Sequence, residues 1–208
     1  MTIREIPEIV IGRLPIYLRT LGRLEQNGCQ VTSSQELGEM LNISPPQIRK
    51  DLSQFGEFGK QGTGYDVQYL AIQIRNILNL NQVWDLAVIG SGDVGHALVR
   101  YQGFLDRGFK VKLIFDNDPK KIGTRIGNFT VLDVSDLKGK VKGIGIKIAM
   151  LAVPAQFAQE VTDLLVVAGI QAILNYAPIQ ISTPNHIRVQ YQDPAIHLQK
   201  MTYYIECR

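Results

Sequence analysis

The chain has 208 residues, of which 45% are apolar and 20% charged, an ordinary composition for a globular protein of one or two domains. No apolar run approaches the ~20 residues that cross a bilayer, and the N-terminus lacks a signal-peptide pattern, so we expect a cytoplasmic protein without a membrane segment. The net charge is only +3 and the two cysteines lack metal-ligand spacing, so neither bulk charge nor cysteine pattern predicts nucleic-acid or metal binding.

Helix signals fill the first part of the chain. Apolar residues three and four positions apart predict an amphipathic helix over residues 7–27. Ser33-Ser34-Gln35-Glu36 has the pattern of a capping box and predicts a helix over Ser34–Leu41. Ser44, followed by two prolines, predicts the start of another helix over Pro45–Phe55. The turn between these two helices is about three residues long, which is the spacing of a helix-turn-helix.

The second helix of this pair has the composition of a recognition helix. Polar and basic groups on it suit phosphates and base edges in a major groove; they are Ser44, Gln47, Arg49, Lys50 and Ser53. The alternative is an ordinary helical hairpin with a solvated face. Residues 55–65 favour DNA binding, because their glycines and alternating aromatics predict a β-hairpin, the wing of a winged helix. Lys60 at its tip would meet phosphate or the minor groove.

A glycine-rich turn dominates the second part of the chain, after a domain boundary near residue 82. Residues 85–98 have the pattern of a strand, a turn and a helix, with Gly90, Gly92 and Gly95 in G-x-G-x-x-G spacing. These glycines suit a tight turn, the approach of a pyrophosphate and close packing of helix on strand. Ser91, Asp93 and Val94 complete the expected phosphate site at the helix N-terminus. The alternative is a βα turn that binds nothing.

Other segments complete a Rossmann pattern. The strand over residues 110–115 ends at Asp116, about 20 residues after the third glycine, where a carboxylate takes ribose hydroxyls and repels a 2′-phosphate. A buried strand ends in Val153 and Pro154, which would border the cofactor crevice. The helix after the glycine turn is expected to reach about Arg107, with Tyr101 in its second turn, where it is expected to contact the cofactor. Further strands are expected over residues 172–176 and 187–191, as in a parallel sheet.

The last segment predicts a helix beyond a completed sheet. Asp193 suits the N-cap and Pro194 the first helical position. An apolar stripe follows at Leu198, Met201 and Ile205, for which either the chain's own sheet or a second protomer offers a partner surface.

Catalytic groups for nicotinamide chemistry are missing from the pattern. A dehydrogenase needs an acid or base at the nicotinamide, and none of the three histidines lies with a carboxylate and an arginine in a recognisable arrangement. A cofactor domain joined to a DNA-reading domain therefore favours a sensor over an enzyme. The alternatives are a small NAD-linked oxidoreductase with a helical cap and a CoA- or nucleotide-binding regulatory module.

A resemblance to a known family is carried by residues 13–19, 47–53, 55–60, 64–67, 115–116, 153–154 and 173–178 and by the glycine turn. On these stretches the chain resembles the Rex family of redox-sensing transcriptional repressors over nearly its whole length. The resemblance implies a homodimer with a winged helix, a Rossmann domain and a domain-swapped C-terminal helix, which are residues 1–82, 83–191 and 192–208 here. It also implies that the protein binds palindromic operators, is released by NADH, with NAD⁺ a weak competitor, and has no enzymatic activity.

The resemblance further implies a switch between two pairings of one carboxylate. Tyr101 would bond to Asp193 of the partner subunit when NADH is bound, and Arg19 would pair with Asp193 in the DNA-bound state. Two positions depart from the family pattern. Gln61 stands where a basic wing residue is usual, and Pro194 stands where a larger apolar residue near the nicotinamide is usual.

Overall fold

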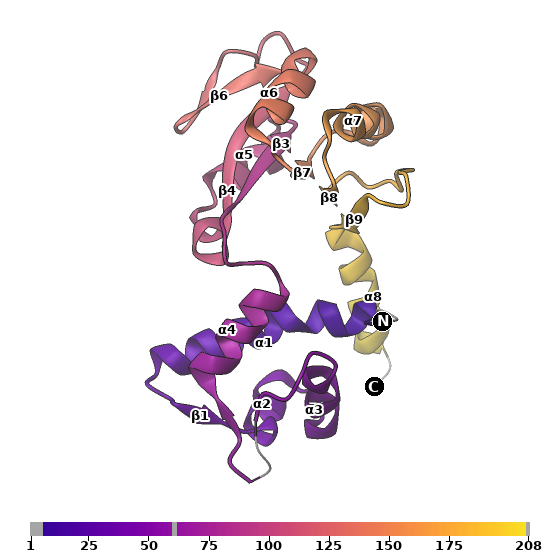
Figure 1. The fold of residues 1–208 in the computed structure, drawn as a ribbon. Coiled ribbons are helices and arrows are strands. Elements are labelled where there is room, and N and C mark those ends of the chain that lie inside the picture. Colours follow the sequence, from indigo (N-terminus) through magenta and orange to yellow (C-terminus); the bar gives the residue numbers. More distant parts are fainter. Residues whose placement is uncertain (1–5, 60–61, 207–208) are drawn as a thin grey trace. The chain divides into compact units, whose positions relative to one another are not determined.

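The computed structural model describes residues 6–59 and 62–206, and contacts divide the chain into the units Met1–Gln82 and Val83–Arg208 (Figure 1). Lys60 and Gln61, expected at the tip of the wing, lie outside the described residues. Among the residues described, no helix is both long and apolar enough to span a membrane.

The first unit is a small helical domain with one short antiparallel strand pair. Apolar residues three and four apart on its helices form one buried core around Leu14, Tyr17, Ile48 and Leu70. The strand pair joins the chain before the second helix to the chain before the fourth. In order, the elements are α1 (Glu8–Gln26), β1 (Val31–Thr32), α2 (Ser34–Leu41), α3 (Pro45–Ser53), β2 (Tyr65–Asp66) and α4 (Val67–Ile77).

The predicted helix-turn-helix is confirmed, with its capping box. The Ser33 hydroxyl accepts a hydrogen bond from the Glu36 N–H at 3.1 Å, and the Glu36 carboxylate accepts one from the Ser33 N–H at 2.9 Å. At the start of α3, Ser44 takes the N-cap position and Pro45 the first turn, but the Ser44 side chain makes no capping hydrogen bond. The helix α3 ends at Ser53, two residues before the predicted Phe55.

The tip of the wing, which was predicted as a hairpin over residues 55–65, includes Lys60 and Gln61 and therefore lies outside the described residues. Residues 55–59 form a turn, an irregular segment and a bend, and residues 62–63 form a turn. Gly64 forms an isolated β-bridge, and the strand β2 that follows pairs with β1, where Thr32 lies opposite Tyr65. Gly64 adopts a left-handed φ of 78°, and a Cβ there would overlap the carbonyl oxygen of Thr32. The backbone can approach β1 so closely because residue 64 is a glycine, and the end of the predicted wing segment therefore pairs with a strand far away in the chain.

The second unit is the predicted Rossmann domain. Its sheet has the strand order β5-β6-β4-β3-β7-β8-β9, with every neighbouring pair parallel except β5 and β6. Without the edge strand β5, this order corresponds to the 3-2-1-4-5-6 arrangement of dinucleotide-binding folds. The strands are β3 (Trp84–Ile89), β4 (Phe109–Asp116), β5 (Arg125–Ile126), β6 (Phe129–Asp133), β7 (Ile148–Leu151), β8 (Ala172–Asn175) and β9 (Arg188–Tyr191).

Both faces of this sheet are buried. Along β3, Ala87 and Ile89 belong to one core cluster and Leu86 and Val88 to the other, as expected for a parallel strand between two layers. The first cluster includes residues of α6 and α7, and the second includes residues of α5. The helices of the unit are α5 (Asp93–Arg100), η1 (Gln102–Arg107), η2 (Val134–Asp136), α6 (Leu137–Ile144), α7 (Ala155–Ala168) and α8 (Pro194–Glu206).

The first Rossmann helix is shorter than predicted. The helix α5 ends at Arg100, and Tyr101 is its extended C-cap rather than a residue of its second turn. The Tyr101 ring contacts Phe104 edge-on at 4.9 Å and lies against Gly103, where a Cβ would fall 2.6 Å from the ring. The helix breaks at Tyr101, and the absence of a side chain at Gly103 lets the ring fold back over the short helix η1.

The C-terminal helix α8 does not pack on its own sheet. Its N-terminus forms as predicted, since Asp193 accepts a hydrogen bond from the Ala195 N–H at 2.9 Å. Every side chain from Ala195 to Ile205 is nevertheless exposed. The apolar members of this surface are Ile196, Leu198, Met201, Tyr203, Tyr204 and Ile205. The chain's own sheet is therefore excluded as the surface that covers the apolar side chains of α8.

Candidate functional site

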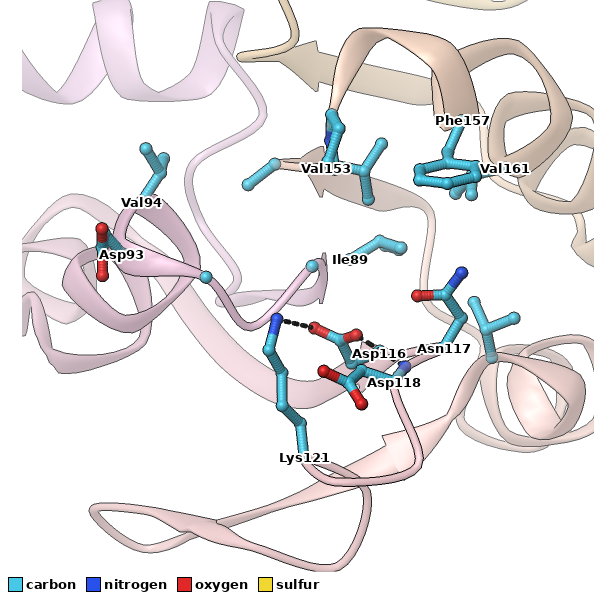
Figure 2. A pocket seen from close by; sticks show the side chains of 15 residues that line it. Ile89, Asp93, Val94, Asp116, Asn117, Asp118, Lys121, Val153, Phe157 and Val161 are labelled. Carbon is cyan, nitrogen blue, oxygen red and sulfur yellow. Dashed lines mark hydrogen bonds and ion pairs between the residues drawn. The ribbon is translucent and has the colours of Figure 1, made fainter.

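A cavity of about 440 Å³ lies at the carboxyl ends of the central strands, beside the glycine turn (Figure 2). The strand order reverses between β3 and β7, and ligands of open α/β sheets bind at that point. The volume is in the range of small-molecule sites. The lining residues are Ile89, Gly90, Gly92, Asp93, Val94, Asp116, Asn117, Asp118, Lys121, Val134, Ala152, Val153, Pro154, Phe157 and Val161.

The three glycines of the turn have three separate steric roles. Gly90 has a φ of 97°, and a Cβ there would overlap the carbonyl oxygen of Ala152. A Cβ at Gly95 would overlap the carbonyl oxygen of Gly90, so α5 can pack on the turn only with glycine at this position. A Cβ at Gly92 would meet nothing within 4 Å, and Gly92 lines the cavity. The turn therefore leaves bare backbone facing the cavity where a pyrophosphate would approach.

The N-terminus of α5 adds an electrostatic feature to this bare backbone. The helix begins after Gly92, and the first N–H groups of a helix have no acceptor within it. These N–H groups and the helix dipole favour an anion. Residues of the turn and of the first helical turn therefore fit a diphosphate group.

Asp116 is the buried centre of the polar side of the site. Its Oδ2 accepts hydrogen bonds from the Ser91 N–H at 2.7 Å and the Ser91 hydroxyl at 2.6 Å. Lys121 Nζ lies 3.3 Å from the same oxygen, and the Asp118 N–H donates to Oδ1 at 2.9 Å (Figure 2). Burial on its own would raise the pKa of Asp116, but these donors and the charge of Lys121 lower it to about 2.

This bonding gives Asp116 a structural role that sequence reasoning missed. Its carboxylate ties the end of β4 to the glycine turn through Ser91, which is buried and does not line the cavity. Sequence reasoning also missed Lys121, which brings a positive charge to the end of the site predicted to hold ribose. A signal was present, because Lys121 follows Asp116 by five residues on the turn after the strand.

The other side of the cavity is apolar. Val153 and Pro154, both predicted to border the crevice, line it where β7 ends. Phe157 and Val161 of α7 extend this side, as Figure 2 shows, although sequence reasoning named neither. Tyr101, predicted to contact the cofactor, is not among the lining residues.

The candidate recognition helix α3 presents most of its predicted groups to solvent. Ser44, Arg49, Lys50 and Ser53 are exposed, and the Arg49 guanidinium donates to the Ser34 hydroxyl at 2.8 Å. Gln47 is half-buried and donates to Asp51 at 2.6 Å. Lys60 lies outside the described residues, so the structure gives it no position.

The remaining predicted residues lie in different units. Arg19 is exposed on α1 of the first unit, whereas Tyr101 and Asp193 belong to the second. Among the described residues, no group of three or more His, Cys, Asp or Glu side chains is arranged to hold a metal ion.

A helix-turn-helix unit joined to a Rossmann unit with a cavity at its switch point defines a class of protein, the ligand-responsive DNA-binding regulator. Two family models agree with this division. One, described as "CoA binding domain", matches residues 81–179, and one described as "Putative DNA-binding protein N-terminus" matches residues 5–53.

Full-length comparisons identify the family. The chain is 49% identical over 201 residues to the redox-sensing transcriptional repressor Rex of Roseiflexus sp. (strain RS-1), covering 97% of this chain and 91% of the relative. It is 50% identical over 199 residues to the same repressor of Chloroflexus aurantiacus (strain ATCC 29366 / DSM 635 / J-10-fl), covering 96% and 94%. The chain therefore belongs to the Rex family of redox-sensing transcriptional repressors, whose members are repressors and not enzymes.

Solved structures of a Rex-family repressor agree with this family assignment. The crystal structure of RSP in complex with β-NAD⁺ and operator DNA is similar, with a TM-score of 0.92 and 36% identity over 97% of this chain and 93% of that one. The structure of RSP in complex with β-NADH has a TM-score of 0.87 and 34% identity over 99% and 95%. The oxidoreductase interpretation of the sequence is not supported by these matches.

The bonding of Asp116 predicts how stability depends on pH. A folded-state pKa of about 2 lies below the usual value near ~4, so the ionised carboxylate stabilises the fold above about pH 4. That contribution is lost as the pH falls from about 4 towards 2. We expect the difference in free energy of unfolding between the unaltered protein and Asp116→Asn to be constant above pH 5 and to narrow below pH 4, measured by urea denaturation.

Ser91→Ala is the matched variant, because it keeps the carboxylate and removes one donor. In Ser91→Ala the folded-state pKa of Asp116 is expected to lie nearer to its value in the unfolded chain. The free energy of unfolding of Ser91→Ala is therefore expected to change less between pH 5 and pH 3 than that of the unaltered protein. A difference between the unaltered protein and Asp116→Asn that stays constant down to pH 3 would contradict this role of Asp116.

Proposed function

We propose that this protein represses transcription by binding operator DNA and leaves the operator when NADH occupies the cavity at the glycine turn, with NAD⁺ as the weaker effector. The observation that carries the proposal is this cavity, built on bare glycine backbone at the switch point of a Rossmann sheet. The RSP structures, one with β-NAD⁺ and operator DNA and one with β-NADH, support it. A CoA or other nucleotide ligand is the second candidate, favoured only by the CoA-binding family match.

The lining residues divide between the two ends of such a cofactor. Gly90, Gly92 and the first turn of α5, with Asp93 and Val94, hold the pyrophosphate. At the polar end, Asp116 binds the adenosine ribose, and its negative charge repels a 2′-phosphate. The positive charge of Lys121 offsets part of this repulsion.

The apolar end of the cavity supports a preference for the reduced cofactor. Val153 and Pro154 line it beside Phe157. The nicotinamide ring is cationic in NAD⁺ and neutral in NADH, and an apolar surface disfavours the cation. NADH is therefore the ligand that this end of the site stabilises more.

DNA binding is assigned to α3 and the segment after it. The exposed groups Ser44, Arg49, Lys50 and Ser53 lie on α3 or at its N-cap, and α3 is the second helix of the helix-turn-helix. Arg49 offers two parallel N–H groups, which suit the O6 and N7 atoms of guanine. Lys60, after α3 in the chain, supplies a phosphate contact in this proposal.

The exposed helix α8 supports a homodimer, in which residues 192–208 cross to the partner subunit. Its apolar side chains, among them Leu198 at 62% and Ile205 at 73% exposure, are uncovered in the single chain. A two-fold dimer presents two α3 helices to DNA and therefore reads a palindromic operator. A DNA-binding regulator of this kind works in the cytoplasm.

The proposed switch is one carboxylate with two rival partners. Asp193 precedes α8, Arg19 lies on the first helix of the DNA-binding unit, and Tyr101 follows the helix that starts at the glycine turn. An Arg19–Asp193 pair favours the DNA-bound state, and a bond from Tyr101 to Asp193 of the partner subunit favours the NADH-bound state. NADH shifts the balance by its differential affinity for the two states.

A fluorescence anisotropy titration tests the function. The protein is bound to a labelled palindromic operator duplex, and NADH, NAD⁺, NADPH or CoA is added. We expect NADH to release the DNA at the lowest concentration, because the apolar end of the cavity favours the neutral ring and Asp116 disfavours a 2′-phosphate. Release by CoA at lower concentration than by NADH, or no response to NADH, would contradict the proposed effector.

Substitution of Tyr101 tests the switch. Tyr101→Phe keeps the ring contacts with Phe104 and Gly103 but removes the hydroxyl. We expect unchanged thermal stability, unchanged operator affinity without cofactor, and release only at higher NADH concentration in the same titration. Phe104→Leu is the control, since it alters the ring packing and leaves the Tyr101 hydroxyl. If Tyr101→Phe responds to NADH like the unaltered protein, Asp193 is only an N-cap and the relay is wrong.

A further inference from the structure

The recognition helix α3 carries a buried carboxylate. Asp51 is fully buried, and it accepts hydrogen bonds from two residues of α1 and from one residue of its own helix. Arg13 of α1 donates from Nε to Oδ2 at 2.5 Å and from its terminal nitrogen to Oδ1 at 2.7 Å. The Tyr17 hydroxyl, also of α1, donates to Oδ2 at 2.6 Å. Gln47, one turn earlier on α3, donates from Nε2 to Oδ1 at 2.6 Å.

These donors keep Asp51 ionised. Burial alone would raise the pKa of Asp51, but the bonds from Arg13, Tyr17 and Gln47 and the charge of Arg13 lower it. The bond to Asp51 also raises the pKa of Arg13, and burial together with that bond raises the pKa of Tyr17. An ionised carboxylate only accepts hydrogen bonds. Asp51 therefore faces three donors as an acceptor at every pH at which the protein works.

The acceptor at Asp51 determines which way the Gln47 amide points. A glutamine amide has a carbonyl oxygen and an NH₂ group of nearly equal size, and its orientation follows from its hydrogen-bond partners. Rotating the Gln47 amide by 180° would place its carbonyl oxygen against the Asp51 carboxylate. The nitrogen therefore stays on Asp51, and the bond uses one of its two hydrogens. Within the described residues, the second N–H and the carbonyl oxygen of Gln47 have no protein partner.

The second N–H and the carbonyl oxygen of Gln47 together form an edge that can recognise a base. One N–H donor beside one carbonyl acceptor is the pattern by which glutamine binds the N7 and N6 atoms of adenine in the major groove. Gln47 lies in the first turn of α3, the part of a recognition helix that contacts base edges. We propose that Asp51 is a positioning residue that holds the Gln47 amide in one orientation and so gives the protein a preference for adenine at one operator position. This inference rests on the proposed binding of operator DNA.

Binding to a set of operators with single base-pair changes tests the proposal. Each position of the half-site is replaced in turn, and affinities are measured by anisotropy without cofactor. Gln47→Ala is expected to lose an adenine preference of about five- to 150-fold at one position. Asp51→Asn keeps Gln47, but the amide of the new asparagine both donates and accepts hydrogen bonds and therefore no longer holds the Gln47 amide in one orientation. The adenine preference at that same position is expected to fall at least about fivefold.

Tyr17→Phe is the matched control. It removes another donor from the same carboxylate and leaves the bond to Gln47. The adenine preference of Tyr17→Phe is expected to stay within about twofold of that of the unaltered protein, even if its stability falls. A uniform loss of affinity for all operators in Asp51→Asn, with the adenine preference retained, would mean that Asp51 only supports the fold and would overturn the proposal.

A second measurement needs neither DNA nor an altered protein. NMR of the ¹⁵N-labelled protein reports exchange of glutamine side-chain amide hydrogens with water. The Gln47 amide is expected to exchange at least about tenfold more slowly than that of Gln68, which is exposed on α4, because a hydrogen bond to a charged group must open first. Equal exchange rates would overturn the inference. Failure of the unaltered protein to bind any operator would instead contradict the proposed function.

Discussion

The hydrogen bonds from Ser91 to Asp116 connect the two halves of the cofactor site. They join the glycine turn after β3 to the end of β4, and the carboxylate is almost completely buried. A buried carboxylate is costly unless it is paired, and Asp116 has backbone, hydroxyl and ammonium donors around it. The close approach of Gly90 and Gly95 to neighbouring carbonyl oxygens further restricts the conformation of the turn. The cavity, the bare backbone at Gly92 and the start of α5 all depend on this arrangement.

A similar arrangement of hydrogen bonds occurs in the DNA-binding unit. Asp51, like Asp116, is a buried carboxylate held by several donors, and it joins α3 to Arg13 and Tyr17 of α1. Asp51 is buried between α3 and α1, whereas Asp116 itself lines the cavity, and each carboxylate ties together two segments of its own unit. Such preorganisation lowers the entropy lost on binding. Substitution of either carboxylate removes these hydrogen bonds and is therefore expected to lower stability.

Local sequence patterns were enough for much of the fold. The capping box at Ser33, the proline start of α3 and the spacing of the three glycines each depend on residues within one turn, and each forms as predicted. The strand order follows from the Rossmann pattern that these glycines begin. The lining of the cavity by Val153 and Pro154 was predictable for the same reason, because carboxyl ends of parallel strands meet at one edge.

Features that depend on distant residues were missed. The wing segment pairs with β1 because Gly64 permits close approach to Thr32, a contact between residues far apart in the chain. Asp51 has the sequence context of an ordinary helical residue, and its role appears only with Arg13, 38 residues away. The break of α5 at Tyr101 was missed for a local reason, because the ring lies against Gly103 two residues later, a contact that apolar periodicity does not show. Periodicity and capping signals contain no information on such contacts.

Calorimetric titration of NADH into the unaltered protein and into Asp116→Asn tests most directly whether the site held together by Asp116 is the NADH site. Asparagine replaces the charged acceptor of the Ser91 and Asp118 donors by a neutral amide, so the glycine turn loses its anchor. Circular dichroism confirms in parallel that the variant is folded. We predict NADH binding to the unaltered protein and an affinity at least about tenfold weaker in Asp116→Asn. Equal NADH affinity in the two folded proteins would contradict the assignment.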